Sequence, residues 1–78
     1  MKEEHEKIIE HIISEFKRTE GKVFKEYYNT LFDNHYIQFI ITKMLTEEMK
    51  CIEEIDNQFY ILKTKGWDFT SFKEIKEK

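Results

Sequence analysis

Residues 51–62 read CIEEIDNQFYIL, two short runs of apolar residues separated by Asp56-Asn57. An Asp-Asn pair tolerates the positive φ angles that a tight hairpin turn requires. The second run, Gln58 to Leu62, is rich in the aromatic and β-branched residues that favour strands. The sequence therefore predicts a two-stranded β-ribbon, with Cys51 to Ile55 as its first strand.

A helical alternative exists for the same segment. Ile52 and Ile55 are three positions apart, which breaks the two-residue alternation of a half-buried strand. Met44, Leu45 and Glu48, followed by these two isoleucines, have the spacing of a continuing helix. An all-α bundle is therefore the alternative to the fold with a hairpin.

Three amphipathic helices are predicted before the ribbon. The first extends from Glu3 to Thr19, has acidic residues in its early turns, and is ended by Gly21. The second continues to Phe32, and Asp33 or Asn34 caps the third. The apolar stripes are Ile8, Ile9, Ile12, Ile13 and Phe16 in the first helix, Val23, Phe24, Tyr27, Tyr28, Leu31 and Phe32 in the second, and Ile37, Ile40, Ile41, Met44 and Leu45 in the third.

A short closing helix is predicted after the ribbon, because Ser71 and Glu74 have the spacing of a capping box. The chain has 78 residues, enough for one hydrophobic core. We therefore expect a single helix-rich α+β domain over residues 1–78. Large apolar groups are concentrated in its tail, at Trp67, Phe69, Phe72 and Ile75.

Composition narrows the class of protein. The net charge is −3, so the chain lacks the overall basic character of many nucleic-acid-binding domains. Its one cysteine, Cys51, cannot form an internal disulfide, and we expect a buried structural thiol. Neither a signal peptide nor an apolar run of membrane-spanning length is recognisable, so a cytoplasmic location is expected.

No catalytic or metal-binding arrangement is recognisable in the sequence. His5 and His11 are six positions apart and lack the i, i+4 spacing of a helical metal pair. Cys51 has no CxxC partner, and Gly21 and Gly66 are too far apart for a phosphate-binding loop. We expect a binding protein rather than an enzyme, without a metal or other cofactor.

The predicted order of three helices, a two-stranded ribbon and a closing helix resembles the winged helix-turn-helix domains of MarR-like and PadR-like transcription regulators. In these domains the second wing strand commonly ends in an aromatic residue, a leucine, a Thr-x-Lys-Gly step and another aromatic residue. Residues 60–69 read YILKTKGWDF, in which Tyr60, Leu62, Gly66 and Phe69 fit this pattern. The resemblance covers nearly the whole chain, through short motifs of moderate specificity.

The resemblance implies that the third helix enters the major groove of DNA, as in a small transcription regulator. Gln38 would then pair with adenine, and Lys43 would contact guanine or phosphate. Lys22 and Lys25 at the entry to the second helix would contact the DNA backbone. The candidate contact residues for DNA or another partner are Lys22, Lys25, His35, Gln38, Phe39, Thr42 and Lys43.

The alternative function is a winged-helix protein-interaction module, including an accessory or phage-type protein, that does not bind DNA. Phe39 is expected at the centre of the outward face of the third helix, where a protein contact suits it better than base-edge hydrogen bonds. The predicted wing tip, Asp56-Asn57, follows Glu53 and Glu54, which phosphate would repel.

A homodimer formed through the tail and the first helix is also expected. Trp67 and Phe72 are its candidate contacts, because a chain of this length has limited interior in which to bury them. The alternative is a monomer in which both rings fold back onto the first helix.

Overall fold

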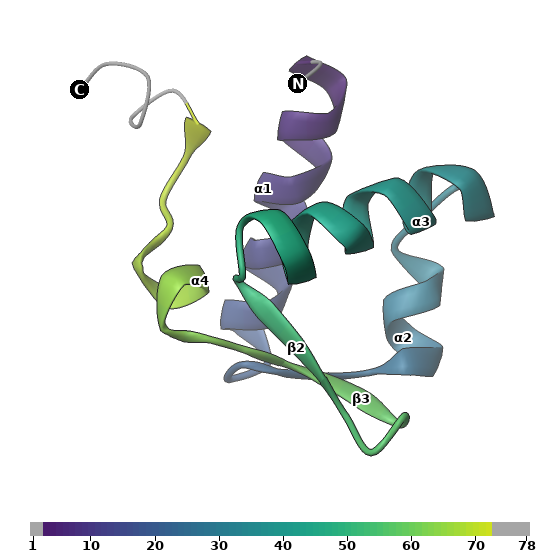
Figure 1. The fold of residues 1–78 in the computed structure, drawn as a ribbon, viewed down its shortest axis with the longest axis vertical. Coiled ribbons are helices and arrows are strands. Elements are labelled where there is room, and N and C mark those ends of the chain that lie inside the picture. Colours follow the sequence, from purple (N-terminus) through teal and green to yellow (C-terminus); the bar gives the residue numbers. More distant parts are fainter. Residues whose placement is uncertain (1–2, 73–78) are drawn as a thin grey trace.

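The computed structural model describes residues 3–72 of the chain. These residues form a helix-rich α+β fold with one three-stranded antiparallel sheet (Figure 1). In chain order the elements are α1 (Glu3–Arg18), β1 (Lys22–Phe24), α2 (Lys25–Thr30), α3 (His35–Lys43), the π-helical turn η1 (Met44–Glu48), β2 (Ile52–Ile55), β3 (Phe59–Leu62) and α4 (Thr64–Asp68).

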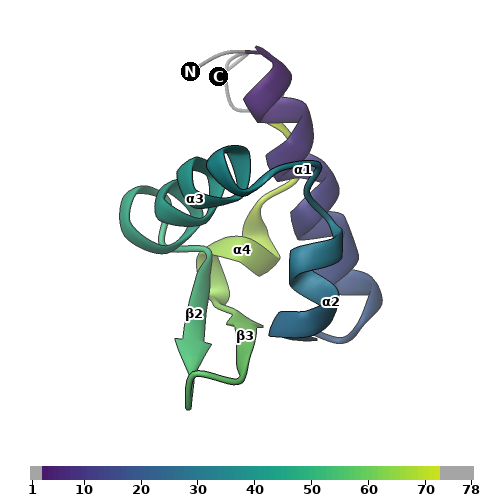
Figure 2. The same cartoon turned by 90° about the vertical axis from the view of Figure 1, so that its right-hand side faces the viewer.

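The predicted hairpin is confirmed, and the all-α alternative is wrong. Strands β2 and β3 pair antiparallel, with Ile55 opposite Phe59. Asp56 and Asn57 have φ angles of 53° and 58°, which these two residue types tolerate. The amide of Gln58 closes the turn by donating to the Ile55 carbonyl at 3.0 Å. The hairpin extends away from the helices (Figure 2).

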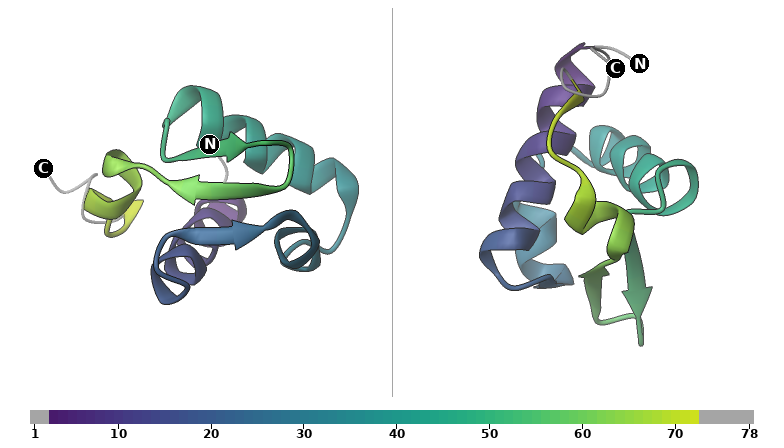
Figure 3. Two further views of the ribbon diagram at one scale, coloured as in Figure 1. Left: turned by 90° about the horizontal axis from the view of Figure 1, so that it is seen from below. Right: turned by 90° about the vertical axis from the view of Figure 1, so that its left-hand side faces the viewer.

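The sheet has a third strand, formed by residues that were predicted to be helical. Val23 and Phe24 were expected in the second helix, but they belong to β1, and α2 begins only at Lys25. Strand β1 pairs with the free edge of β3, so that β3 lies in the middle of the sheet (Figure 3). Backbone pairing with this edge outweighs the helical spacing of the apolar residues, because Val23 is buried equally well in the strand.

The first helix ends as predicted, although Gly21 does not act alone. Glu20 takes the left-handed conformation, with a φ angle of 62°, and Gly21 follows with 89°. The Gly21 amide donates to the Phe16 carbonyl at 2.6 Å, and the Glu20 amide donates to the Lys17 carbonyl at 3.2 Å. These two bonds form a Schellman motif, which satisfies carbonyl groups at the end of α1.

The third helix begins at the predicted cap. The Asn34 side chain accepts a hydrogen bond from the Ile37 amide at 2.8 Å. The helix continues through η1, where the Met49 amide donates to the Met44 carbonyl at 2.8 Å. Lys50, with a φ angle of 54°, then turns the chain into β2. The connection from η1 to β2 therefore requires Lys50 to adopt a left-handed conformation, which has a steric cost for a lysine.

The core lies between α1, α3 and the inner face of the sheet. All the predicted stripe residues of α1 except Ile8 are buried, whereas α3 and η1 contribute Ile41 and Leu45 as their fully buried members. Ile37, Ile40 and Met44 are only half-buried. The inner face of the sheet contributes Val23, Ile52, Tyr60 and Leu62, and Cys51 is buried beside it.

Helix α4 lies directly after the hairpin, where only the end of the wing was expected. Gly66 allows it to pack closely, because a Cβ atom at this position would lie 2.6 Å from the Cys51 carbonyl oxygen. Phe69 follows α4 and is buried. The closing helix predicted from Ser71 and Glu74 falls largely on residues 73–78, outside the described residues.

Candidate interaction groove

A groove of about 540 Å³ lies between the third helix and the hairpin. We call it the α3 groove. Most of its lining comes from successive turns of α3 and η1, and strand β3 contributes one ring. The lining residues are His35, Gln38, Phe39, Thr42, Lys43, Thr46, Glu47 and Tyr60.

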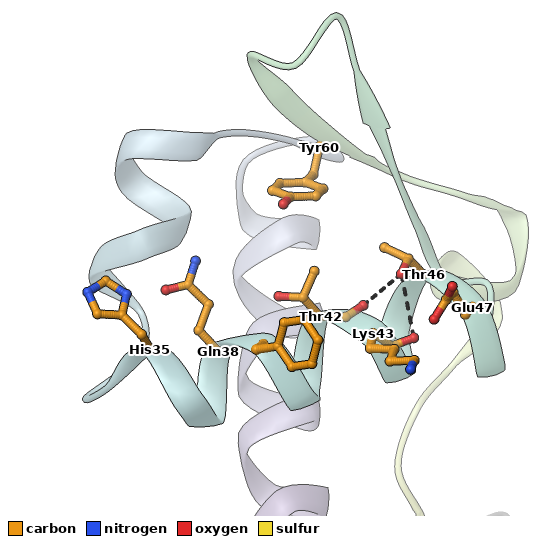
Figure 4. Close-up of a pocket in the computed structure, with 8 residues that line it drawn as sticks. His35, Gln38, Thr42, Lys43, Thr46, Glu47 and Tyr60 are labelled. Atoms are coloured by element: carbon orange, nitrogen blue, oxygen red, sulfur yellow. Dashed lines mark hydrogen bonds between the residues drawn. The ribbon is translucent and has the colours of Figure 1, made fainter.

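The inner wall of the α3 groove is Tyr60. Its side chain belongs to the inner face of the sheet and is 8% exposed, while Gln38 and Thr42 point towards it from α3 (Figure 4). The Tyr60 ring packs against the ring of Tyr28 in α2, with the centroids 4.5 Å apart and the ring planes tilted by 39°. Burial raises the pKa of the Tyr60 phenol. The groove therefore has a rigid aromatic wall that stays uncharged at neutral pH.

Hydrogen bonds to α2 and within α3 hold the polar side chains of the groove. The Tyr28 hydroxyl and the Thr42 hydroxyl are 2.6 Å apart. The Gln38 amide nitrogen donates to the Asn29 side chain at 2.5 Å, and Thr46 donates to the Thr42 carbonyl at 2.8 Å. Gln38, which was predicted to pair with adenine, thus has a local partner for its amide donor.

Large aromatic side chains are exposed on α3 beside this groove. Phe39 is 68% exposed and Tyr36 is 73% exposed. An exposed pair of this size, three residues apart on one helix, is characteristic of a contact surface rather than of a solvated helix face.

The charges around the α3 groove do not favour phosphate. Lys43 is the one lysine or arginine that lines it, and Glu47 lines it as well. Residues 51–62 of the hairpin contain Glu53, Glu54 and Asp56 but no lysine or arginine. A DNA backbone next to this hairpin would meet acidic groups.

The structure places the predicted contact residues in two groups. Five of the seven line the α3 groove, namely His35, Gln38, Phe39, Thr42 and Lys43. The other two, Lys22 and Lys25, lie elsewhere. The Lys25 ammonium is 2.8 Å from a Glu54 carboxylate oxygen and donates to the Asn57 side chain at 2.6 Å. Lys22 lies on the outer face of the sheet, with its ammonium 4.2 Å from the centroid of Phe59.

Three residues of the groove, Tyr60, Thr46 and Glu47, were not among the predicted site residues. Thr46 has the same outward spacing on the third helix as Thr42, so its position was predictable. Tyr60 was assigned only as part of the wing motif. Its role as the wall of the groove depends on the tertiary packing that brings β3 close to α3.

The two predicted dimer contacts differ in exposure. Phe72 is half-buried against the core, with its ring 5.0 Å from that of Phe69, and its amide donates to Glu10 of α1 at 2.9 Å. Trp67 remains 45% exposed. Phe72 therefore folds back towards the first helix, as in the monomer alternative. Of the two predicted dimer contacts, Trp67 is the one that retains a large exposed surface.

Within residues 3–72, no group of three or more His, Cys, Asp or Glu side chains could hold a metal ion. Cys51 is 2% exposed, and burial raises the pKa of its thiol more than nearby Lys65 lowers it. It is a buried thiol, as predicted.

Comparison with known protein families, with curated proteins and with solved structures finds no match to this chain. None of the helices in residues 3–72 has both the length and the apolar character required to cross a membrane. The function must therefore be inferred from the groove and the surfaces themselves.

Proposed function

We propose that this chain is a winged helix-turn-helix domain that binds a protein partner through the α3 groove and the aromatic surface beside it. The order of three helices followed by an antiparallel hairpin supports this fold. The turn of the β2–β3 hairpin that would form the wing projects at one end of the domain, while β3 pairs with β1 (Figure 2).

The exposure of Phe39 and Tyr36 on α3 is the observation that carries the proposal. Aromatic side chains are enriched at the centres of protein interfaces, where they fill pockets on the partner. The α3 groove next to them could receive an apolar or amide-bearing side chain, since Tyr60 offers a ring and Thr42 a hydroxyl. The acidic hairpin would favour a partner with basic groups facing it.

Site-directed photo-crosslinking tests this proposal. A photoreactive benzoyl-phenylalanine at position 39 should yield a covalent adduct with a discrete protein in cells of the source organism. Lys7, exposed on α1, is the matched control position and should give no such adduct. The adduct should also disappear when Tyr36→Ala is combined with the crosslinker, because the two rings belong to one surface.

Duplex DNA is the second candidate ligand, with the chain acting as a transcription regulator. The exposed position of Lys43 on α3 favours it, because no described acidic group forms an ion pair with this lysine. Fluorescence anisotropy with a generic duplex distinguishes the candidates. Salt-dependent binding that the triple Lys22→Ala, Lys25→Ala, Lys43→Ala variant loses would support DNA. Unchanged anisotropy at low salt would support the protein partner.

A further inference from the structure

A second groove, of about 500 Å³, lies on the side of the sheet that faces away from the core. We call it the lysine groove. It joins the outer face of β2 and β3 to the start of α4. Its lining residues are Lys50, Glu53, Ile61, Leu62, Lys63, Thr64, Lys65 and Trp67.

The lysine groove is cationic, in contrast to the α3 groove. Lys50, Lys63 and Lys65 are all exposed, and none of them forms an ion pair within residues 3–72. Glu53 is the one acidic residue in the lining. Although the protein as a whole is acidic, three lysines and one glutamate line this groove, so its surface is positively charged.

The outer face of the sheet extends this positive surface. Lys22 lies opposite Ile61 in the pairing of β1 with β3, so its side chain emerges next to the lysine groove. Its ammonium is 4.2 Å from the centroid of Phe59 and 4.9 Å from that of Phe24. A fourth lysine is therefore held over aromatic rings on the same face.

Exposed aromatic rings lie at both ends of this surface. Trp67 is 45% exposed and packs against Gly21, and Phe24 is 56% exposed. Gly21 precedes β1 directly and Phe24 ends it, so the two residues are at most about 10 Å apart along the chain. Lys22 lies between them. Aromatic surface therefore alternates with positive charge along the edge strand.

We propose that the lysine groove and the adjoining outer face of the sheet bind single-stranded nucleic acid. Lysine ammonium groups neutralise phosphates, and exposed aromatic rings offer stacking surfaces for unpaired bases. A duplex fits this surface less well, because its bases are already stacked on one another. This function is separate from the proposed protein contact, since the two grooves share no lining residue.

Charge complementarity distinguishes this occupant from a second copy of the chain. A two-fold contact through this face would bring Lys50, Lys63 and Lys65 of one copy close to the same lysines of the other, which is unfavourable. Each of these lysines would instead strengthen the binding of a polyanion. Stacking of bases on Trp67 and Phe24 would strengthen the binding of a nucleic acid further, and a polyanion without bases would lack this contribution.

The 78-residue chain provides its own probe, because Trp67 is its one tryptophan. An oligothymidylate of about ten nucleotides should quench Trp67 emission at low salt, and the affinity should fall as salt rises. An oligouridylate and an oligodeoxyuridylate of equal length, which differ in the 2′-hydroxyl alone, show whether the sugar matters. Inorganic polyphosphate should bind more weakly and leave the emission nearly unchanged.

Single-residue variants of the lysine groove test which side chains contribute to oligonucleotide binding. Each of Lys63→Ala and Lys65→Ala should lower the slope of log affinity against log salt by about 0.7 for each phosphate that the variant no longer neutralises. Glu53→Gln should strengthen binding, because it removes the acid from the lining. Trp67→Leu, followed with a fluorescein-labelled oligothymidylate, should weaken binding about tenfold, in line with the loss of one stacked base. The matched control Lys7→Ala, on the exposed face of α1, should leave binding unchanged.

Four results would overturn the proposal. They are no quenching at low salt, equal binding of duplex and single strand, equal binding of polyphosphate, and a shift of Trp67 emission with protein concentration alone. The last would assign this face to a second copy. Tyr36→Ala separates the two functions, because it should abolish the adduct formed by the crosslinker at position 39 without affecting oligonucleotide binding.

Discussion

The indole ring of Trp67 lies against Gly21, so closely that a Cβ atom on residue 21 would be 2.7 Å from Cζ2 of the ring. This contact joins α4, at the end of the described chain, to the end of α1. It also fixes one edge of the ring, so that the remaining surface of Trp67 faces the lysine groove.

Gly21→Ala should therefore lower the free energy of unfolding by about 1–3 kcal/mol. The φ angle of 89° disfavours a side chain, and the new methyl group would displace Trp67. Urea unfolding followed by circular dichroism measures the loss, and a change in Trp67 emission of the folded state reports the displaced ring. Ser14→Ala, on the exposed face of α1, should change stability by less than about 0.5 kcal/mol.

Glu20→Gly should stabilise the protein by up to about 1 kcal/mol. Glu20 occupies the left-handed position of the Schellman motif with a φ angle of 62°, where glycine avoids a steric cost. The matched change Glu26→Gly, within α2, should instead destabilise by about 1 kcal/mol. If both variants lose stability to the same extent, the helix does not end in the way described.

Tyr28→Phe should change both the stability at neutral pH and its dependence on alkaline pH. Burial raises the pKa of the Tyr28 phenol well above its ordinary value. Above about pH 10 the unfolded chain therefore loses a proton that the folded chain keeps, and stability falls as the pH rises. The variant removes this contribution to the fall, and it loses about 1 kcal/mol at neutral pH with the hydrogen bond to Thr42.

Thr42→Val is the control for that prediction. It removes the same hydrogen bond but leaves the buried phenol in place. Urea unfolding at several pH values should show the loss at neutral pH without a shallower alkaline fall. A Tyr28→Phe variant with the parent's pH dependence would contradict the attribution of the alkaline fall in stability to the raised pKa of Tyr28.

Cys51 should react slowly with a thiol reagent in the folded protein. Its side chain is buried and its pKa is raised by that burial, so the thiolate is both scarce and inaccessible. The same shift means that stability falls as the pH rises above about 8.5, where the unfolded thiol ionises. Reaction at the rate of the urea-unfolded chain would contradict a structural role, whereas acceleration by urea is the expected result.

Several features of the fold were predictable from the sequence because their causes are local. Asp56-Asn57 determines the hairpin turn, since both residues adopt positive φ angles at low cost. Asn34 determines the start of α3, because its side chain bonds to an amide three residues later. The outward face of α3 followed from helical spacing alone, which is why five predicted contact residues line one groove.

The remaining features depend on which segments meet in space. Val23 and Phe24 have helical spacing, but they form a strand because β3 offers an unpaired edge where the chain returns from α1. The hairpin brings Tyr60 to the α3 groove and Glu54 to Lys25, so a predicted phosphate contact becomes part of an ion pair.

The lysine groove is the feature that depends most clearly on the tertiary structure. The acidic hairpin separates Lys50 from Lys63 and Lys65 in the sequence. The antiparallel pairing of β2 with β3 brings Lys50 back beside these two lysines. By itself, the sequence determined α1, the start of α3 and the hairpin turn, because these depend on contacts between near neighbours. The tertiary structure decided the charge and shape of both surfaces, because these depend on residues that only the folded sheet brings together.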